Sequence, residues 1–212
     1  MKRGWPGLVL LTLAAGGAPA WADSWPGPTV FTVFGASGRH FVRFVPGESV
    51  GDTVGFAGSP RGRYATALQY ALQPDRSYRL LHEVTLVNPV SPLNALVADD
   101  GHFVTLDNWH NVGFGKVVAI YAPSGKLVRG YELTDLYSSE KLEKIPHSIS
   151  SRYWRCAPVH FVEQEQKSVY VPEALGGYFV FRLATGEMKY EAGSRTTCDS
   201  PNQPLSWSTL GR

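Results

Sequence analysis

The sequence predicts an all-β fold made of three four-stranded β-meander units, and two observations support this prediction. Short runs rich in Val, Phe and Tyr, bounded by Gly, Pro, Asp or Ser, follow one another along most of the chain, which is typical of strands. The strand–turn–strand pattern also recurs, because residues 37–44 align with 100–106 and residues 74–81 align with 124–131. Recurrence at roughly 45 to 60 residues indicates repeated β units.

The first unit spans residues 29–87 and follows a Pro- and Gly-rich lead-in at residues 23–28. Its four predicted strands occupy residues 29–35, 40–45, 63–72 and 78–87. Residues 88–92 contain two prolines, and two prolines are not expected within one central strand. This segment is therefore interpreted as the connector to the next unit.

The second unit spans residues 94–133, with strands predicted at 94–98, 102–107, 116–121 and 127–133. Two of its turns are expected at Asp99-Asp100-Gly101 and at Pro123-Ser124-Gly125, because Asp, Ser, Pro and Gly supply the backbone geometry of tight turns.

A short helix is expected within residues 134–146, where apolar and charged residues alternate at helical spacing. Ser138 or Ser139 is the candidate N-cap, and Pro146 would stop the helix. The third unit spans residues 153–192, with strands at 153–162, 168–171, 178–183 and 187–190. Residues 193–212 are expected to form an irregular tail.

The repeats resemble β-propeller proteins of the NHL or YVTN type. The similarity is carried by the turn at residues 99–101, the strand at 117–121, the Ser124-Gly125 turn and the strand at 126–128, and again by residues 178–190. The resemblance implies blade-like sheets that act as a scaffold. Three units are fewer than the four to eight blades of a closed propeller, so the sheets would form an open assembly or two chains would complete a ring. A two-sheet sandwich is the alternative.

The first residues predict export. Lys2 and Arg3 precede an apolar stretch at residues 8–18, and residues 20–22 fit a cleavage site before Asp23. We therefore expect a signal peptide at residues 1–22, a single β-repeat domain at 23–212 and a periplasmic or extracellular location. Residues 8–18 are too few to span a bilayer, and no later stretch is apolar enough to predict a membrane span.

The charge of the mature chain argues against nucleic acid as a partner. Residues 1–22 contain two basic residues and no acidic residue, so their removal would leave 18 basic and 18 acidic side chains. Nucleic-acid binding needs clustered Lys and Arg. A monomer is expected, in which the strand at residues 29–35 pairs with the third unit, because an apolar edge strand is a liability in water.

Residues 107–111 form the densest group of functional side chains, namely Asp107, Asn108, Trp109, His110 and Asn111. They join two predicted strands, and β scaffolds commonly carry binding residues on such loops. The competing interpretation is a hairpin loop with Asn and Gly turn chemistry, in which Trp109 packs into the core.

Residues 147–155 form a second candidate site, in which His147, Arg152 and Trp154 stand among serines and a second arginine. Arginine can bind a carboxylate or phosphate, and tryptophan can offer a stacking face. The competing interpretation is a polar linker that leads into the third unit.

No catalytic motif has its required context. Residues 47–51 match G-x-S-x-G, but a nucleophile elbow needs a following helix, and residues 52–62 contain three Gly and one Pro. The sequence therefore predicts a non-catalytic module that binds a protein or small ligand through its loops, with no cofactor and no metal. The alternative is a metal-assisted hydrolase or lyase in which another unit completes a site around Asp107 and His110.

Cys156 and Cys198, the two cysteines of the chain, are predicted to form a disulfide, because paired cysteines are the rule in exported proteins. The bond would stabilise the fold by about 3 to 4 kcal/mol in the chain-entropy model. Mass spectrometry of the alkylated protein should show no modified thiol before reduction and two after it. Two alkylated thiols in the unreduced protein would contradict the pairing.

Overall fold

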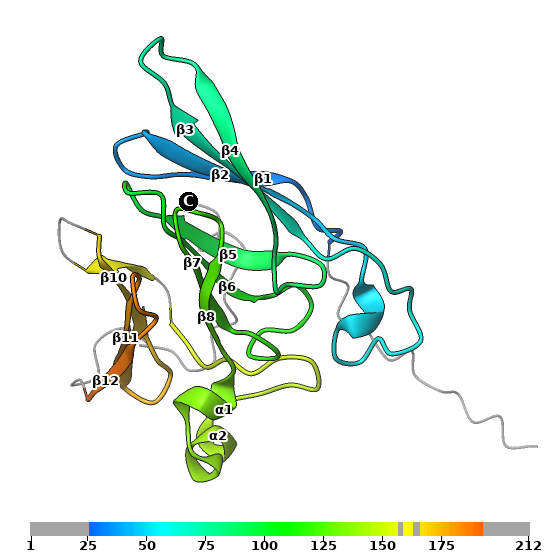
Figure 1. Ribbon diagram of the computed structural model, residues 1–212. Coiled ribbons are helices and arrows are strands. Elements are labelled where there is room, and N and C mark those ends of the chain that lie inside the picture. The colour runs from blue at the N-terminus through cyan, green and yellow to red at the C-terminus, as the bar shows by residue number, and fades with distance from the viewer. Residues whose placement is uncertain (1–25, 157–158, 163–165, 193–212) are drawn as a thin grey trace, which may run out of the picture.

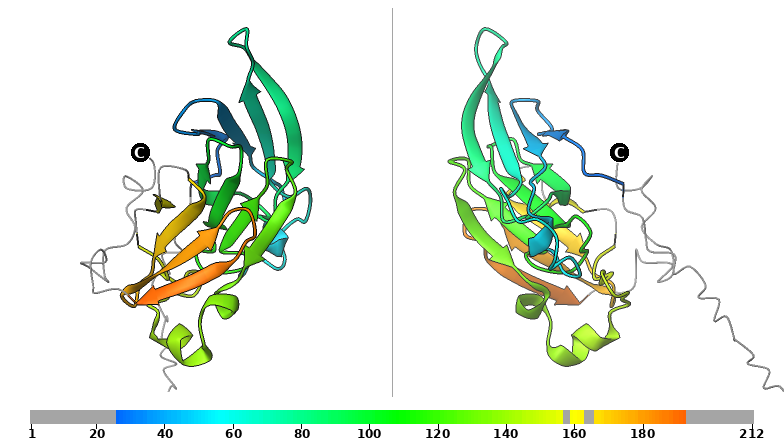
Figure 2. Two further views of the ribbon diagram at one scale, coloured as in Figure 1. Left: turned by 60° about the vertical axis from the view of Figure 1, so that its left-hand side comes forward. Right: turned by 90° about the vertical axis from the view of Figure 1, so that its right-hand side faces the viewer.

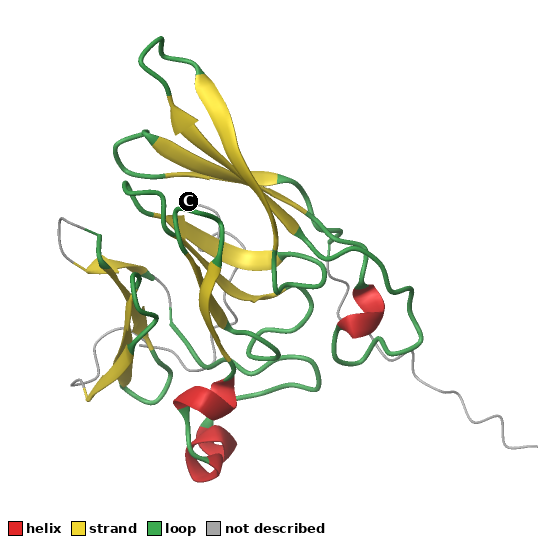
Figure 3. Ribbon diagram, in the orientation of Figure 1, coloured by secondary structure: helices red, strands yellow, loops and turns green. Residues whose placement is uncertain are grey.

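The computed structural model describes residues 26–156, 159–162 and 166–192 (Figure 1). In this part of the chain, twelve strands form three separate four-stranded antiparallel sheets. Two short α-helices and one 3₁₀ turn accompany them (Figure 3). The predicted all-β fold of three four-stranded units is confirmed, and the two-sheet sandwich is not the observed arrangement.

The first sheet contains the four strands of the first predicted unit, in the order in which they occur along the chain. They are β1 (Phe31–Phe34), β2 (His40–Val45), β3 (Thr66–Leu72) and β4 (Tyr78–Thr85). The connection between β2 and β3 is long and carries the 3₁₀ turn η1 (Val50–Asp52).

The middle sheet is likewise a meander, of β5 (Pro92–Val97), β6 (Phe103–Asn108), β7 (Val118–Tyr121) and β8 (Leu127–Tyr131). Pro92 is the first residue of β5, a position at which a strand tolerates proline. Both predicted turns are present, with Gly101 at φ +94° and Gly125 at φ +78°. A Cβ atom on Gly125 would lie 2.7 Å from Val84 of the first sheet, so glycine also allows the two sheets to approach.

The last sheet follows the same plan, with β9 (His160–Val162), β10 (Ser168–Pro172), β11 (Gly177–Arg182) and β12 (Met188–Ala192). Its first strand is much shorter than the predicted strand at residues 153–162. Residues 154–156 are buried and lie outside β9. Their backbone still pairs with the last sheet, because Arg155 forms an antiparallel bridge with Glu173 and the Cys156 backbone donates to the Pro172 carbonyl at 2.9 Å.

Two helices replace the single helix that the sequence predicted between the second and third units. They are α1 (Leu133–Leu136) and α2 (Ser139–Lys144), with Ser138 at the N-cap position of α2. The chain leaves helical geometry at Tyr137, with φ −128° and ψ 146°. There the buried tyrosine hydroxyl donates to Glu173 Oε2 at 3.0 Å. Burial, reinforced by Glu173, raises the pKa of this hydroxyl, which therefore stays protonated.

The middle sheet is packed on both faces. Successive residues of β6 and β7 alternate between two cores: Phe103 and Tyr121 contact the first sheet, whereas Val104 and Ile120 face the last sheet. Figure 2 shows the three sheets following one another in this order. Each sheet thus packs face to face on the next, which is the arrangement of propeller blades.

The strand pairing on which the expected monomer depended is not seen among the described residues. β1 pairs with β2, and the last sheet contains only its own four strands. Within the described part of the chain, no helix is long and apolar enough to cross a bilayer. The predicted signal peptide and Cys198 lie outside the described residues, so the predicted disulfide stays a prediction.

Replacing Phe103 by alanine should strongly destabilise the protein. Its buried ring stacks on Tyr121 with centroids 4.5 Å apart and meets Phe44 of the first sheet at 6.2 Å. Loss of such a ring costs about 3 to 5 kcal/mol. Leu127, which is 48% exposed, supplies the control Leu127→Ala, with an expected loss under about 0.5 kcal/mol. Urea unfolding measures the free energy of unfolding of both variants. Equal losses would contradict this account of the core.

Candidate functional site

Asp107, the first of the candidate site residues, is fully buried at the end of β6. Its Oδ1 accepts hydrogen bonds from Trp154 Nε1 at 2.7 Å and from the Gly113 backbone at 3.0 Å. Its Oδ2 accepts one from Arg155 Nε at 2.7 Å. The backbone of Asp107 has φ +56°, a conformation that Asp and Asn adopt more readily than most residues.

Arg155 neutralises this carboxylate and is buried as well. Its Nη2 also donates to Asn94 Oδ1 on β5 at 2.8 Å. A buried ion pair persists only when hydrogen bonds satisfy its remaining polar atoms, and these contacts provide them. The two segments that the sequence offered as separate sites therefore meet, and their meeting point is an internal link between the middle and last sheets.

Asn108 also forms its hydrogen bonds within the protein. Its Oδ1 accepts from Asn88 Nδ2 at 2.7 Å, and its Nδ2 donates to the Phe114 carbonyl at 2.6 Å. Asn88 belongs to the connector between the first two sheets and donates in addition to the Asp107 carbonyl at 3.0 Å. Asn108 thus fixes the connector and the β6–β7 loop.

Asn111 ties together loops of the first two units and the linker that leads into the third. Its Oδ1 accepts from the Val54 backbone at 2.7 Å, and its Nδ2 donates to the carbonyls of Val54 at 3.1 Å and Ser150 at 3.4 Å. In addition, the Arg152 backbone donates to the Val112 carbonyl at 2.8 Å. We call the surface formed by residues 48–64, 109–116 and 146–153 the loop end; its three segments lie on the right of Figure 1.

The most exposed apolar side chain of the loop end is Ile149, which is 98% exposed. It sits at the tip of a tight hairpin in which His147 and Arg152 form a β-bridge and the Ser148 backbone donates to the Ser151 carbonyl at 2.7 Å. Val54, in the segment 48–64, and Tyr153, at the end of the segment 146–153, are exposed as well. The loop end therefore combines a fixed backbone with apolar side chains in solvent.

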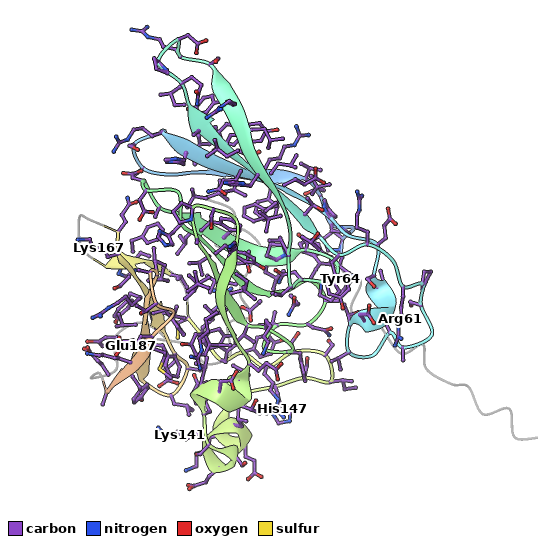
Figure 4. The ribbon with its side chains drawn as sticks, viewed as in Figure 1. Arg61, Tyr64, Lys141, His147, Lys167 and Glu187 are labelled. Carbon is purple, nitrogen blue, oxygen red and sulfur yellow. The ribbon has the colours of Figure 1, made fainter. Side chains whose placement is uncertain are left out.

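His147 and Arg152 contribute cationic or polar groups to this hairpin. His147 is exposed, with its Nδ1 3.2 Å from the Ile145 carbonyl, and Figure 4 shows it beside the helices. Arg152 is half-buried and donates from Nη1 to the Leu142 carbonyl at 3.0 Å. Both side chains stand at the rim of the hairpin that carries Ile149.

Trp109 and His110 are half-buried, and the His110 ring lies 5.1 Å from the ring of Phe56 and 6.3 Å from that of Trp109. Burial lowers the pKa of His110, because the charged imidazolium is disfavoured away from water. This aromatic group joins the loop of the first unit to the loop of the second.

The loop between β2 and β3 is the part of the loop end that sequence reasoning missed. Asp52 binds Arg61, with Oδ1 and Nε 3.0 Å apart, and burial together with Asp52 raises the pKa of Tyr64. Figure 4 shows Arg61 and Tyr64 on this loop. The segment reads as a glycine-rich connector, so its place beside residues 109–116 depends on the packing of the sheets.

Among the described residues, neither the serine nucleophile nor the metal site suggested by the sequence is assembled. Ser49 is buried and donates to Asp52 Oδ2 at 2.6 Å, and the 3₁₀ turn η1 follows it in place of a helix. Both oxygens of Asp107 already accept hydrogen bonds. Across residues 26–156, 159–162 and 166–192, no three His, Cys, Asp or Glu side chains are grouped to hold a metal.

Comparison with known proteins leaves the family open. No protein-family model matches the chain, and no curated protein is significantly similar to it. Among solved structures, the chain is similar to the crystal structure of Saccharomyces cerevisiae Sqt1, with a TM-score of 0.42 and 11% identity over 81% of this chain and 38% of that one. The propeller-like architecture therefore rests on the three sheets themselves.

Replacing Asp107 by asparagine should cost about 3 to 5 kcal/mol, because Arg155 would remain buried without its counter-charge. The new amide would also turn an N–H₂ group toward one of the existing donors. Glu140→Gln is the matched control, since Glu140 and Lys144 form a pair of the same 2.7 Å length with side chains 80% and 60% exposed. Loss of this surface pair should cost about 0.3 to 0.5 kcal/mol.

Urea unfolding of the three proteins measures this difference. An Asp107→Asn variant that loses no more free energy of unfolding than Glu140→Gln would show that the buried pair is not a structural link.

Proposed function

We propose that this protein is an exported, non-catalytic β-repeat module that binds a protein partner through its loop end. One observation carries the proposal: Asn111 holds together the backbone of a first-unit loop, its own loop and the linker to the third unit, and these segments carry exposed apolar side chains. Loops of a β scaffold that are fixed in this way commonly serve recognition. The export part rests on the signal-like residues 1–22.

The fixed backbone of the loop end favours binding. A preformed surface loses less conformational entropy on association than a mobile one. Ile149 is held in solvent by the hairpin bond between Ser148 and Ser151. An exposed apolar group on an ordered support, flanked by Tyr153 and Arg152, has the composition of an interface anchor with a polar rim.

A protein fits this surface better than a small ligand. Sites for small molecules need a few polar groups that converge on the ligand. The carboxylate of Asp107 and the amides of Asn108 and Asn111, which the sequence offered for this task, instead bond to other parts of the chain. The side chains left in solvent are spread over separate loops, as expected for an extended contact.

Substitution of Ile149 by glutamate should weaken binding of the partner so far that the chain no longer captures it. The tagged chain would capture proteins from a periplasmic or secreted extract of the source organism, with quantitative mass spectrometry as readout. The affinity for a true partner should fall at least about thirtyfold, because loss of a central anchor costs about 2 kcal/mol or more. Tyr153→Ala should weaken the same partner.

Leu127→Glu provides the control, since Leu127 is exposed on β8 and outside the loop end. Proteins that bind the wild type and Leu127→Glu but not Ile149→Glu support the proposal. If Ile149→Glu and Tyr153→Ala capture every protein that the wild type captures, the loop end is not the binding surface.

A further inference from the structure

The first sheet has an aromatic outer face that packs on nothing in the described chain. Phe34, Phe41 and Tyr70 lie directly opposite one another on β1, β2 and β3. Their rings are 4.9 and 4.5 Å apart, and Tyr78 of β4 meets Phe41 at 4.8 Å. A continuous aromatic stripe therefore crosses all four strands.

This stripe faces away from the core. The alternate residues Val42, Phe44 and Ala67 are buried against the middle sheet, so Phe41 and Tyr70 project from the opposite face. Phe34 is 55% exposed, and Leu80, which lies opposite Tyr70, is 45% exposed. Large apolar groups gathered on one face of a sheet mark an interaction surface.

The last sheet has a matching outer face at the other end of the stack. Tyr170 of β10 stacks on His160 of β9 at 4.8 Å and contacts the tilted ring of Tyr178 at 4.4 Å. The opposite face of the same sheet carries Val169 and Phe179, which are buried in the core shared with the middle sheet. Both ends of the three-sheet stack are thus lined by aromatic side chains.

The interior of the protein shows how such a face is covered. Phe103 and Tyr121, on neighbouring strands of the middle sheet, stack at 4.5 Å with an angle of 5° between the rings, and the first sheet packs over them. Phe41 and Tyr70 repeat this pair, at 4.5 Å and 12°, on the outer face of the first sheet. The outer face therefore resembles the face of the middle sheet that another sheet covers, but in the described chain no sheet covers it.

We propose that a second copy of the chain supplies this missing sheet. The first sheet of each copy would pack on the last sheet of the other, which continues the order of sheets within the chain. Two such contacts, related by a two-fold axis, close six sheets into a ring within the range of known propellers. This arrangement leaves neither aromatic face in water, and it differs from the monomer expected from the sequence.

The mass of the chain in solution tests the proposal, by light scattering after size-exclusion chromatography across a range of concentrations. The wild type should have twice the mass of one chain. Leu80→Glu on the first sheet and Tyr170→Glu on the last sheet should each give single chains with unchanged circular dichroism. If Leu80→Glu does not fold, Leu72→Glu, also at an exposed position of the first sheet, replaces it.

Mixing the two variants separates the proposed contact from other dimers. Leu80→Glu retains an intact last sheet and Tyr170→Glu an intact first sheet, so an equimolar mixture should regain two-chain particles through one unaltered contact. Leu127→Glu and Ile149→Glu should remain dimers, which keeps this test independent of the loop end.

Two results would overturn the proposal. If the wild type has the mass of one chain at every concentration, a second copy does not cover the faces. Residues 193–212 or another protein would then be the candidates. A dimer that Tyr170→Glu leaves intact would mean that the last sheet takes no part in the contact.

Discussion

The buried carboxylate of Asp107 is the constraint on which the arrangement of the units depends. A charge placed in the interior must be matched by donors and by an opposite charge, and these come from Gly113, Trp154 and Arg155. The Trp154 and Arg155 side chains therefore point to the middle sheet, while the backbone of the same residues pairs with the last sheet through the bridge between Arg155 and Glu173. The hydrogen bonds of one buried carboxylate thus tie the start of the third unit to the middle sheet.

The middle sheet is tied to both neighbours at both of its ends. At the loop end, Asn111 binds Val54 and Ser150. At the opposite end, Asp99 Oδ1 accepts from the Ser37 backbone at 2.8 Å, and its own backbone donates to Gln166 Oε1 at 2.7 Å. The bond from Ser37 lowers the pKa of Asp99, which therefore remains ionised. Together with the two cores, these hydrogen bonds connect the three sheets, and they also hold the loops at both ends in place.

The candidate site illustrates a general difficulty in reading loops. Polar residues in a loop suggest a ligand, yet Asp107, Asn108 and Asn111 are used to satisfy the chain's own backbone and charges. The competing interpretation of residues 107–111 as a turn therefore explains more of what is observed for these three residues. The proposed binding surface consists of side chains such as Ile149 and Val54, which are 98% and 46% exposed and whose exposure has no signal in the sequence.

The three units, most strand positions and the turns at Gly101 and Gly125 could be predicted from the sequence. These features depend on local rules, namely alternation of side chains, turn chemistry and backbone geometry. Three other features follow from the packing of distant segments: the middle sheet is buried on both faces, Tyr137 divides the helix in two, and residues 107 and 154 meet. The physical reason is the same in each case: burial and the pairing of buried polar groups depend on which segments become neighbours, and no local pattern contains that information.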